Sequence, residues 1–300
     1  MNEPVDIKIA IINKADAINN AINKEEVFEI FSRWSFEAIA PFYKFQQTWV
    51  NKAYNAFKDF DTYLILMYLK QKIYVDYSDR FHYMSVDAFY SQEKIAIEKI
   101  NLIEISKSLN IPKETIRRKV NFLQEKEIIF RTGKSIYLNS KALEIIKPNQ
   151  TLPMLAIFFE KMSIILSKED WFGRSLKREN IEQFIKEHFT VCWEYFYRFQ
   201  ISYLTKHRTA FGDLESWNVW GSVAIAQVSA FTESKKRIIR EELTTHEDYY
   251  LSMLKFKSER GINASSIADI SGIPRATVIR KLKAMEKKVL LKEIKDLNTL

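Results

Sequence analysis

Apolar residues recur every three or four positions from residue 27 to residue 69, and many of them are aromatic, including Phe42, Phe45 and Trp49. Because this period places side chains on one face of a helix, it predicts long amphipathic helices. The same spacing continues through residues 92–105, so the sequence predicts that the chain is still helical there. A further apolar helix is expected at residues 153–167.

The pattern then changes in the middle of the chain. Two short helical stretches, residues 102–109 and 112–126, flank a turn at Asn110. Two β-type runs follow and surround Thr132-Gly133-Lys134, which is typical of a hairpin. A short helix is expected near residues 140–147. The predicted order is therefore helix, tight turn, cationic helix and hairpin.

This order of elements occurs twice. A shift of 162 positions lays Ile111-Pro112 over Ile273-Pro274 and places the second hairpin at residues 289–300. A shift of 154 positions lays residues 42–60 over residues 196–214 without a gap, with eight identical pairs. Because both matches keep the same order along the chain, they predict duplication of a whole unit.

The composition favours helices and allows two units. The chain has 300 residues, of which 47% are hydrophobic, but only 6 glycines and 6 prolines. Folds with many turns are unlikely at that glycine and proline content, so we expect a mainly α fold. The first unit is expected at residues 1–170 and the second at residues 171–300.

Positive charge is concentrated in the two cationic stretches. Residues 112–126 hold five cations and two anions, and residues 274–288 hold six cations and one anion. Their net charges of +3 and +5 account for the whole formal charge of +8. Concentration of charge on a helix is typical of contact with phosphates.

Residues 267–291, IADISGIPRATVIRKLKAMEKKVLL, resemble the DNA-binding core of winged helix-turn-helix bacterial transcription regulators. The long preceding helices, and the helix after the first copy, are most similar to the MarR-type arrangement. The resemblance covers less than a third of the chain. MarR-type proteins are homodimers of one-unit chains, whereas this chain holds both units.

The resemblance implies winged helix-turn-helix units. Together with the repeat and the aromatic helical pattern, it predicts two such units with long aromatic-rich helices, arranged as a pseudo-two-fold internal duplication. The helical parts are expected at about residues 25–95 and 179–258. The winged helices are expected at about residues 96–140 and 259–300, with connecting helices up to residue 170.

The apolar stripe of each cationic helix should face its own unit and leave the opposite face for DNA. The resemblance implies that residues near the helix start read base edges, while others contact phosphates. The base-reading candidates are Lys113, Glu114, Arg117, Asn121, Arg275, Ala276, Ile279 and Lys283. The phosphate candidates are Thr115, Arg118, Thr277 and Arg280. The wing candidates are Arg131, Lys134, Lys292 and Lys295.

These features predict a sequence-specific, double-stranded DNA-binding transcription regulator with two recognition helices in adjacent major grooves. Because the two helices differ in sequence, the site should be asymmetric. The alternative is a plasmid-type replication initiator, in which two winged helices bind origin repeats. A protein-interaction module is a third hypothesis. The protein is expected to be a monomer with pseudo-dimer architecture, or a homodimer.

Other classes of function lack support in the sequence. It shows no glycine-rich phosphate loop, no metal-ligand spacing and no nucleophile elbow, so no enzymatic activity, catalytic residue, metal or cofactor is expected. The single cysteine, Cys192, suits a cytoplasmic protein. The longest uncharged run, residues 216–232, is shorter than the roughly 20 residues of a membrane span. A small-molecule effector could bind among the aromatic residues Trp34, Tyr43, Trp49, Tyr197, Tyr203, Trp217 and Trp220.

Overall fold

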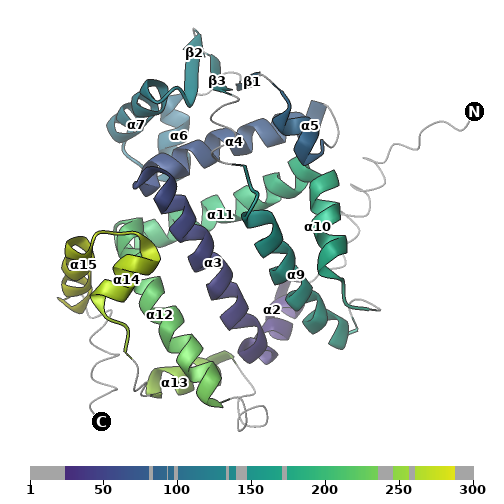
Figure 1. Cartoon of the computed structure of the whole chain (residues 1–300), viewed down its shortest axis with the longest axis vertical. Helices are drawn as coiled ribbons and strands as arrows, with labels where there is room; N and C mark the ends of the chain where they lie inside the picture. The colour runs from purple at the N-terminus through teal and green to yellow at the C-terminus, as the bar shows by residue number, and fades with distance from the viewer. Residues whose placement is uncertain are drawn as a thin grey trace, which may run out of the picture.

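The computed structural model describes residues 24–80, 84–92, 94–97, 101–132, 135–139, 147–170, 174–235, 246–256 and 261–287. Within these residues the protein is mainly helical, as predicted, with one small antiparallel sheet (Figure 1). The helices of the first half are α2 (Lys24–Arg33), α3 (Ser35–Phe57), α4 (Phe60–Arg80), α5 (Val86–Tyr90), α6 (Leu102–Leu109), α7 (Lys113–Glu125) and α9 (Thr151–Lys168). The helices of the second half are α10 (Arg178–Glu187), α11 (Phe189–Phe211), α12 (Leu214–Lys235), α13 (His246–Lys255), α14 (Ala264–Ser271) and α15 (Arg275–Lys287).

The predicted helical stretch at residues 27–69 is divided into α2, α3 and the start of α4. α3 ends at Phe57 and is followed by Lys58, which adopts the left-handed conformation with φ 53°. Asp59 then caps α4, because its Oδ2 accepts a hydrogen bond from the backbone N–H of Thr62 at 3.0 Å. The apolar period crosses this corner because both helices bury their apolar faces in the same core, so periodicity alone could not locate the break.

The sheet has three strands in the order β1, β3, β2. β1 (Lys94–Ile97) pairs with β3 (Ser135–Asn139), which also pairs with β2 (Ile129–Thr132). The prediction that residues 92–105 are continuously helical is therefore wrong, since α6 begins only at Leu102. The segment KIAI alternates β-branched isoleucine with other residues, and the edge of β3 supplies backbone partners that the segment lacks by itself.

Other predicted elements have mixed outcomes. The first hairpin is confirmed as β2 and β3, and the apolar helix expected at residues 153–167 is confirmed as α9. The helix expected near residues 140–147 falls on residues 140–146, which lie outside the described residues. The second hairpin at residues 289–300 also lies outside them.

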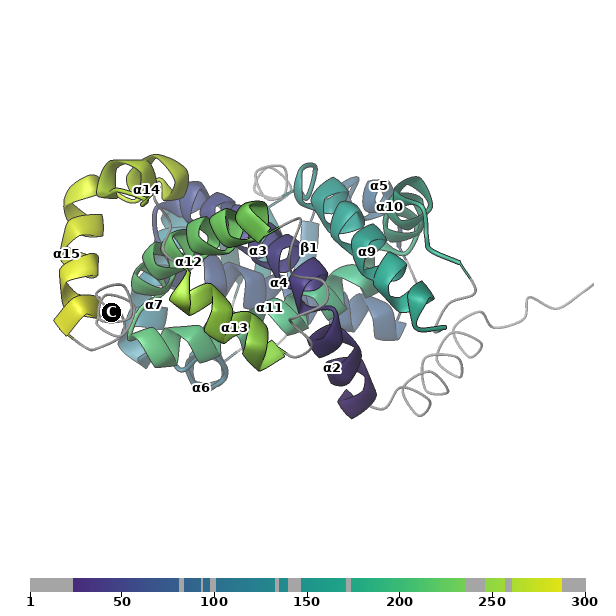
Figure 2. The ribbon, with the colours of Figure 1, turned by 90° about the horizontal axis from the view of Figure 1, so that it is seen from below.

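One hydrophobic core joins the two halves. α4 packs along α11, and α3 packs along α12, so the long helices of each half contact those of the other half (Figures 1 and 2). Val50 of α3, Leu64 of α4 and Val219 of α12 are fully buried, and Trp193 of α11 is 1% exposed. All four residues belong to the same buried cluster. Removal of this apolar surface from water is the main stabilising contribution to the contact between the halves.

Several described helices of the two halves have bounds that match after a constant shift. α3 and α11 each contain 23 residues and are related by a shift of 154 positions. The bounds of α6 and α14, and those of α7 and α15, are related by a shift of 162 positions. The ring contact between Phe42 and Tyr203 (6.0 Å) has its counterpart in the contact between Trp49 and Phe196 (5.6 Å), because the shift of 154 exchanges the members of the two pairs.

Candidate nucleic-acid interface

The first helix-turn-helix is formed by α6 and α7. Asn101 caps α6, since its side-chain oxygen accepts a hydrogen bond from the backbone N–H of Ile103 at 2.9 Å. Asn110 ends α6 in the left-handed conformation, with φ 51° and ψ 42°. Ile111 is buried, and Pro112 leads into α7. The turn is thus fixed by a left-handed residue on one side and a proline on the other.

The second helix-turn-helix, α14 and α15, repeats these features. Asn263 caps α14 by accepting from the backbone N–H of Ser266 at 2.9 Å. Gly272 ends the helix in the left-handed conformation at φ 72°, and Ile273 is buried behind it. Glycine adopts this conformation without steric cost, whereas the equivalent Asn110 is one of the few other residue types that tolerate it.

The predicted facing of both cationic helices is confirmed. Ile116, Val120 and Leu123 of α7 have no exposed surface. In the predicted stripe of α15, Val278 and Met285 are buried and Leu282 is half-buried. The opposite face is exposed in both helices. Of the base-reading candidates, the exposed ones are Lys113, Glu114, Arg117, Asn121, Arg275, Ala276 and Lys283, and Ile279 is half-buried.

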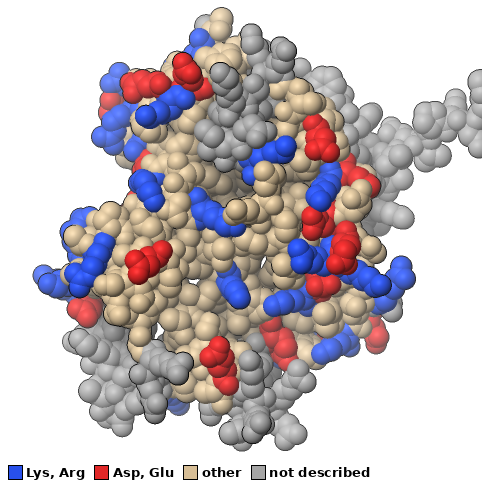
Figure 3. Space-filling model, in the orientation of Figure 1, with Lys and Arg blue, Asp and Glu red and all other residues tan. Residues whose placement is uncertain are grey.

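The phosphate and wing candidates are also accessible where the structure describes them. Arg118, Arg280 and Arg131 are exposed. Thr115 and Thr277 are half-buried. The remaining wing candidates, Lys134, Lys292 and Lys295, lie outside the described residues. Figure 3 shows basic side chains over α7 and α15, and further ones on the opposite side of this face, where α9 and α10 lie.

Two lysines of the cationic helices point inward, which the charge pattern along the chain did not predict. Lys119 Nζ lies 2.7 Å from Asp59 Oδ2, and Lys281 Nζ lies 2.5 Å from Asp213 Oδ2. The side chains of Lys119 and Lys281 are only 21% and 13% exposed. The net charge of each helix therefore overstates what it presents to a polyanion. The shifts of 154 and 162 already pair Asp59 with Asp213 and Lys119 with Lys281, and this was the signal available in the sequence.

Each aspartate also caps a helix. Burial by itself would raise the pKa of the Asp59 carboxyl, but hydrogen bonds from Lys119 and Thr62 and the charge of Lys119 outweigh it and lower the pKa. The pKa of Asp213 is lowered in the same way by Lys281 and by Ser216, whose backbone N–H donates to Asp213 Oδ1 at 2.7 Å. Both carboxylates therefore remain ionised at neutral pH and hold the lysines.

Two base-reading candidates are paired with each other. Arg117 donates to Glu114 through Nε at 3.0 Å and through Nη2 at 2.6 Å. These hydrogen bonds lower the pKa of the Glu114 carboxyl. Both side chains are mostly exposed, so a competing partner can separate the pair at little cost. In α15, by contrast, Arg275 donates to Ser265 of the preceding helix at 3.0 Å.

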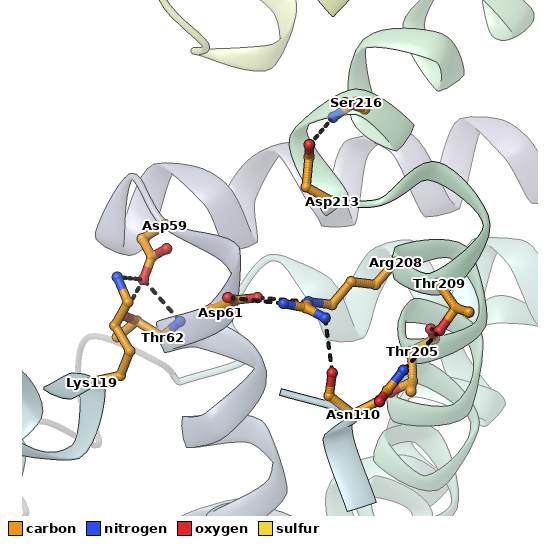
Figure 4. Close-up of polar contacts among 10 residues, drawn as sticks. All are labelled: Asp59, Asp61, Thr62, Asn110, Lys119, Thr205, Arg208, Thr209, Asp213 and Ser216. Atoms are coloured by element: carbon orange, nitrogen blue, oxygen red, sulfur yellow. Dashed lines mark hydrogen bonds and ion pairs between the residues drawn. The ribbon is translucent and has the colours of Figure 1, made fainter. Parts of the chain in front are cut away.

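A polar contact joins the first helix-turn-helix to the second half (Figure 4). Arg208 of α11 forms two hydrogen bonds with the Asp61 carboxylate, at 3.1 and 3.4 Å. Its Nη1 also donates to the backbone carbonyl of Asn110 at 2.9 Å. Thr209 accepts from the Asn110 side chain at 3.4 Å. The sequence patterns gave no sign of this contact.

Several of the aromatic residues expected to line an effector pocket are in contact with other aromatic rings. Trp49 lies edge-on to Tyr63, and Tyr203 lies edge-on to Trp217. A groove of about 400 Å³ is formed elsewhere, between α4, α6 and α11. Its lining residues are Tyr68, Gln71, Ser108, Arg198, Ile201, Ser202, Thr205 and Lys206.

Comparison with models of known protein families, with curated proteins and with solved structures finds no match for this chain. Among the described residues, no three histidine, cysteine or carboxylate side chains are grouped as a metal site would require. No helix in the described part of the chain has the length and apolar character needed to cross a membrane. Any assignment of function therefore depends on the geometry of the two helix-turn-helix elements.

Proposed function

We propose that the protein is a sequence-specific, double-stranded DNA-binding transcription regulator whose single chain holds two winged helix-turn-helix units related by an internal duplication. The observation that carries this proposal is the placement of α7 and α15. Both helices end a capped helix-turn-helix, both expose their polar face, and both lie along the same edge of the molecule, the left edge in Figures 1 and 2.

The order of elements in the first half supports the winged-helix assignment. A strand, two helices joined by a tight turn and a two-stranded hairpin follow one another, and β1 completes the sheet beside β3. This is the order expected of a winged helix-turn-helix, in which the second helix enters the major groove. In the second half, α14 and α15 repeat the two helices with matching caps.

The views of the molecule support a pseudo-two-fold relation. In Figure 1 α7 lies above α15 on the left side of the molecule and α3 crosses in front of α11, as a two-fold line running across the view between them would place equivalent helices. Figure 2 places α14 and α6 on opposite sides of the same line. A line of this kind, pointing towards the edge that carries both cationic helices, is the arrangement by which a dimeric regulator meets neighbouring major grooves.

The chemistry of the exposed faces fits duplex DNA. Arg118 and Arg280 are equivalent exposed cations suited to phosphate contact, whereas Arg117 and Arg275 are suited to guanine edges. Glu114 could accept from cytosine once Arg117 releases it. Since its counterpart in α15 is Ala276, the two half-sites should be unequal and about one helical turn apart, roughly 10 bp.

Selection of bound sequences from a random duplex pool tests this function. The wild-type chain should enrich an asymmetric site, and its affinity should fall linearly with salt on a log–log scale. Arg118→Ala and Arg280→Ala should each reduce the slope by about 0.9. Arg198→Ala, which removes an exposed arginine away from both cationic helices, should leave the slope unchanged.

Enrichment of a perfect palindrome would refute unequal half-sites. Absence of duplex binding would refute the function itself. Mapping the enriched sites to promoters or to origin repeats separates a regulator from a replication initiator.

A further inference from the structure

The two helix-turn-helix elements are held by two corners of the scaffold. The first corner, residues 55–62, joins α3 to α4, and the second corner, residues 208–216, joins α11 to α12. Each corner holds the cationic helix of its own half through an aspartate. Asp59 binds Lys119 of α7, and Asp213 binds Lys281 of α15.

Each corner also contacts the turn of the opposite half. Arg208 and Thr209 in the second corner hydrogen-bond Asn110, the first residue of the turn between α6 and α7. Asn55 in the first corner lies directly against Gly272, the residue between α14 and α15, and a Cβ added there would approach Asn55 Cγ to 3.0 Å. A shift of 154 positions relates Asn55 to Thr209, so the two contacts occupy equivalent places in the two halves.

Every corner therefore connects one cationic helix to the other helix-turn-helix. Asp213 lies only four positions after Thr209, and Asp59 lies four positions after Asn55. A displacement of α7 relative to α15 must break or stretch at least one of these short connections. The relative position of the two cationic helices thus depends on the corners as well as on the hydrophobic core.

We propose that the two corners set the separation of half-sites to which the protein binds. Arg208, in the second corner, is the residue that positions the first helix-turn-helix relative to the second half. This inference rests on the proposed DNA-binding function. In the first corner the contact is close packing of Asn55 on a glycine. In the second it is a polar bridge in which one guanidinium binds both the Asp61 carboxylate and the Asn110 carbonyl.

The Arg208 bridge can fix the orientation of the turn between α6 and α7 relative to α11. A guanidinium presents its donors in a rigid plane, so binding two acceptors on different elements restrains both their distance and their angle. The side chains of Arg208 and Asp61 are only 19% and 24% exposed, so solvent competes weakly for them. Without the bridge, α6 and α7 remain attached through the core and through Asp59, but their turn can move relative to α11.

The test uses a series of duplexes in which the distance between the two selected half-sites is changed by one or two base pairs in either direction. Each added base pair moves a half-site by about 3.4 Å and rotates it by roughly 35°. The wild-type chain should lose about tenfold in affinity per added or removed base pair. Arg208→Ala should lose no more than about threefold per base pair, while its affinity at the best spacing stays within about threefold of the wild type.

Two further variants make the result decisive. Arg198→Ala removes an arginine from the same helix and is the control for charge, because Arg198 pairs with Glu194 outside the corner. It should keep the wild-type dependence on spacing. Asp61→Asn weakens the bridge while keeping its shape and should relax the dependence as Arg208→Ala does, so a folding defect in the alanine variant does not leave the question open.

The inference is overturned if Arg208→Ala and Asp61→Asn keep the wild-type dependence on spacing, or weaken binding equally at all spacings. That result would leave the DNA-binding function intact. If the wild-type chain binds the two half-sites independently of their spacing, the proposed placement of both helices on one duplex fails as well. If it binds no duplex, the proposed function fails first.

Discussion

Replacement of Lys70 by methionine should remove most of the dependence of the free energy of unfolding on pH between pH 6 and pH 9. Lys70 lies in α4 against α11 and is 1% exposed. Its Nζ is 3.2 Å from Tyr197 Oη and 3.4 Å from Tyr90 Oη, and among the described residues no carboxylate pairs with it. Burial without a counter-ion lowers the pKa of this ammonium to about 7.

The size of the effect follows from proton linkage. In the unfolded chain the lysine titrates near 10.5, so between about pH 7 and pH 10.5 unfolding takes up a proton. The free energy of unfolding therefore rises with pH in this window. The rise is about 1.4 kcal/mol per pH unit where Lys70 is fully protonated in the unfolded chain and fully deprotonated in the folded one. From pH 6 to pH 9 the gain is about 2.5 kcal/mol. Burial raises the pKa of the neighbouring Tyr63, Tyr74 and Tyr197, so these phenols stay neutral in the window.

Urea unfolding of the wild type and of Lys70→Met at half-unit steps of pH measures this contribution. The difference between the two curves isolates Lys70, because all other titrating groups are shared. Lys72→Met, which removes a partly exposed lysine from the same helix, should retain the wild-type slope apart from the loss of its ion pair with Glu104. Parallel curves for the wild type and Lys70→Met would show that Lys70 is charged in the folded protein throughout, and would refute this reasoning.

Two further predictions concern the packing of particular residues. Gly272→Ala should lower the free energy of unfolding by about 1–3 kcal/mol, because the new Cβ is strained at φ 72° and overlaps Asn55, whereas Gly261→Ala, where nothing lies within 4 Å, should change it by less than about 0.5 kcal/mol. Equal urea midpoints for the two variants would contradict this. Burial raises the pKa of the Cys192 thiol to about 12, so at pH 8 a thiol reagent should modify the native protein at least about tenfold more slowly than the protein in urea, and equal rates would be inconsistent with the packing described.

The sequence by itself determined the local structure of the candidate interface. Capping asparagines, a left-handed position and a proline define each helix-turn-helix within a few residues, and none of these signals needs a distant partner. The apolar stripes of α7 and α15 were likewise readable, because a period of 3.6 residues states which face is buried. The faces opposite these stripes could therefore be predicted to be exposed. The repeat could be found because many positions related by the two shifts carry the same side chain.

Only the tertiary structure decided which charges are free and how the two halves meet. Lys119 and Lys281 belong to the cationic stretches, yet each is bound by an aspartate that lies 60 or 68 residues earlier in the chain. The helical period at residues 92–105 gave way to a strand because β3 offers backbone partners. The contact of Arg208 with the turn of the other half, and the burial of Lys70, depend on α4 and α11 packing together. Contacts between helices far apart in sequence leave no period along the chain, so the arrangement that would select the spacing of a DNA site is visible only after the chain has folded.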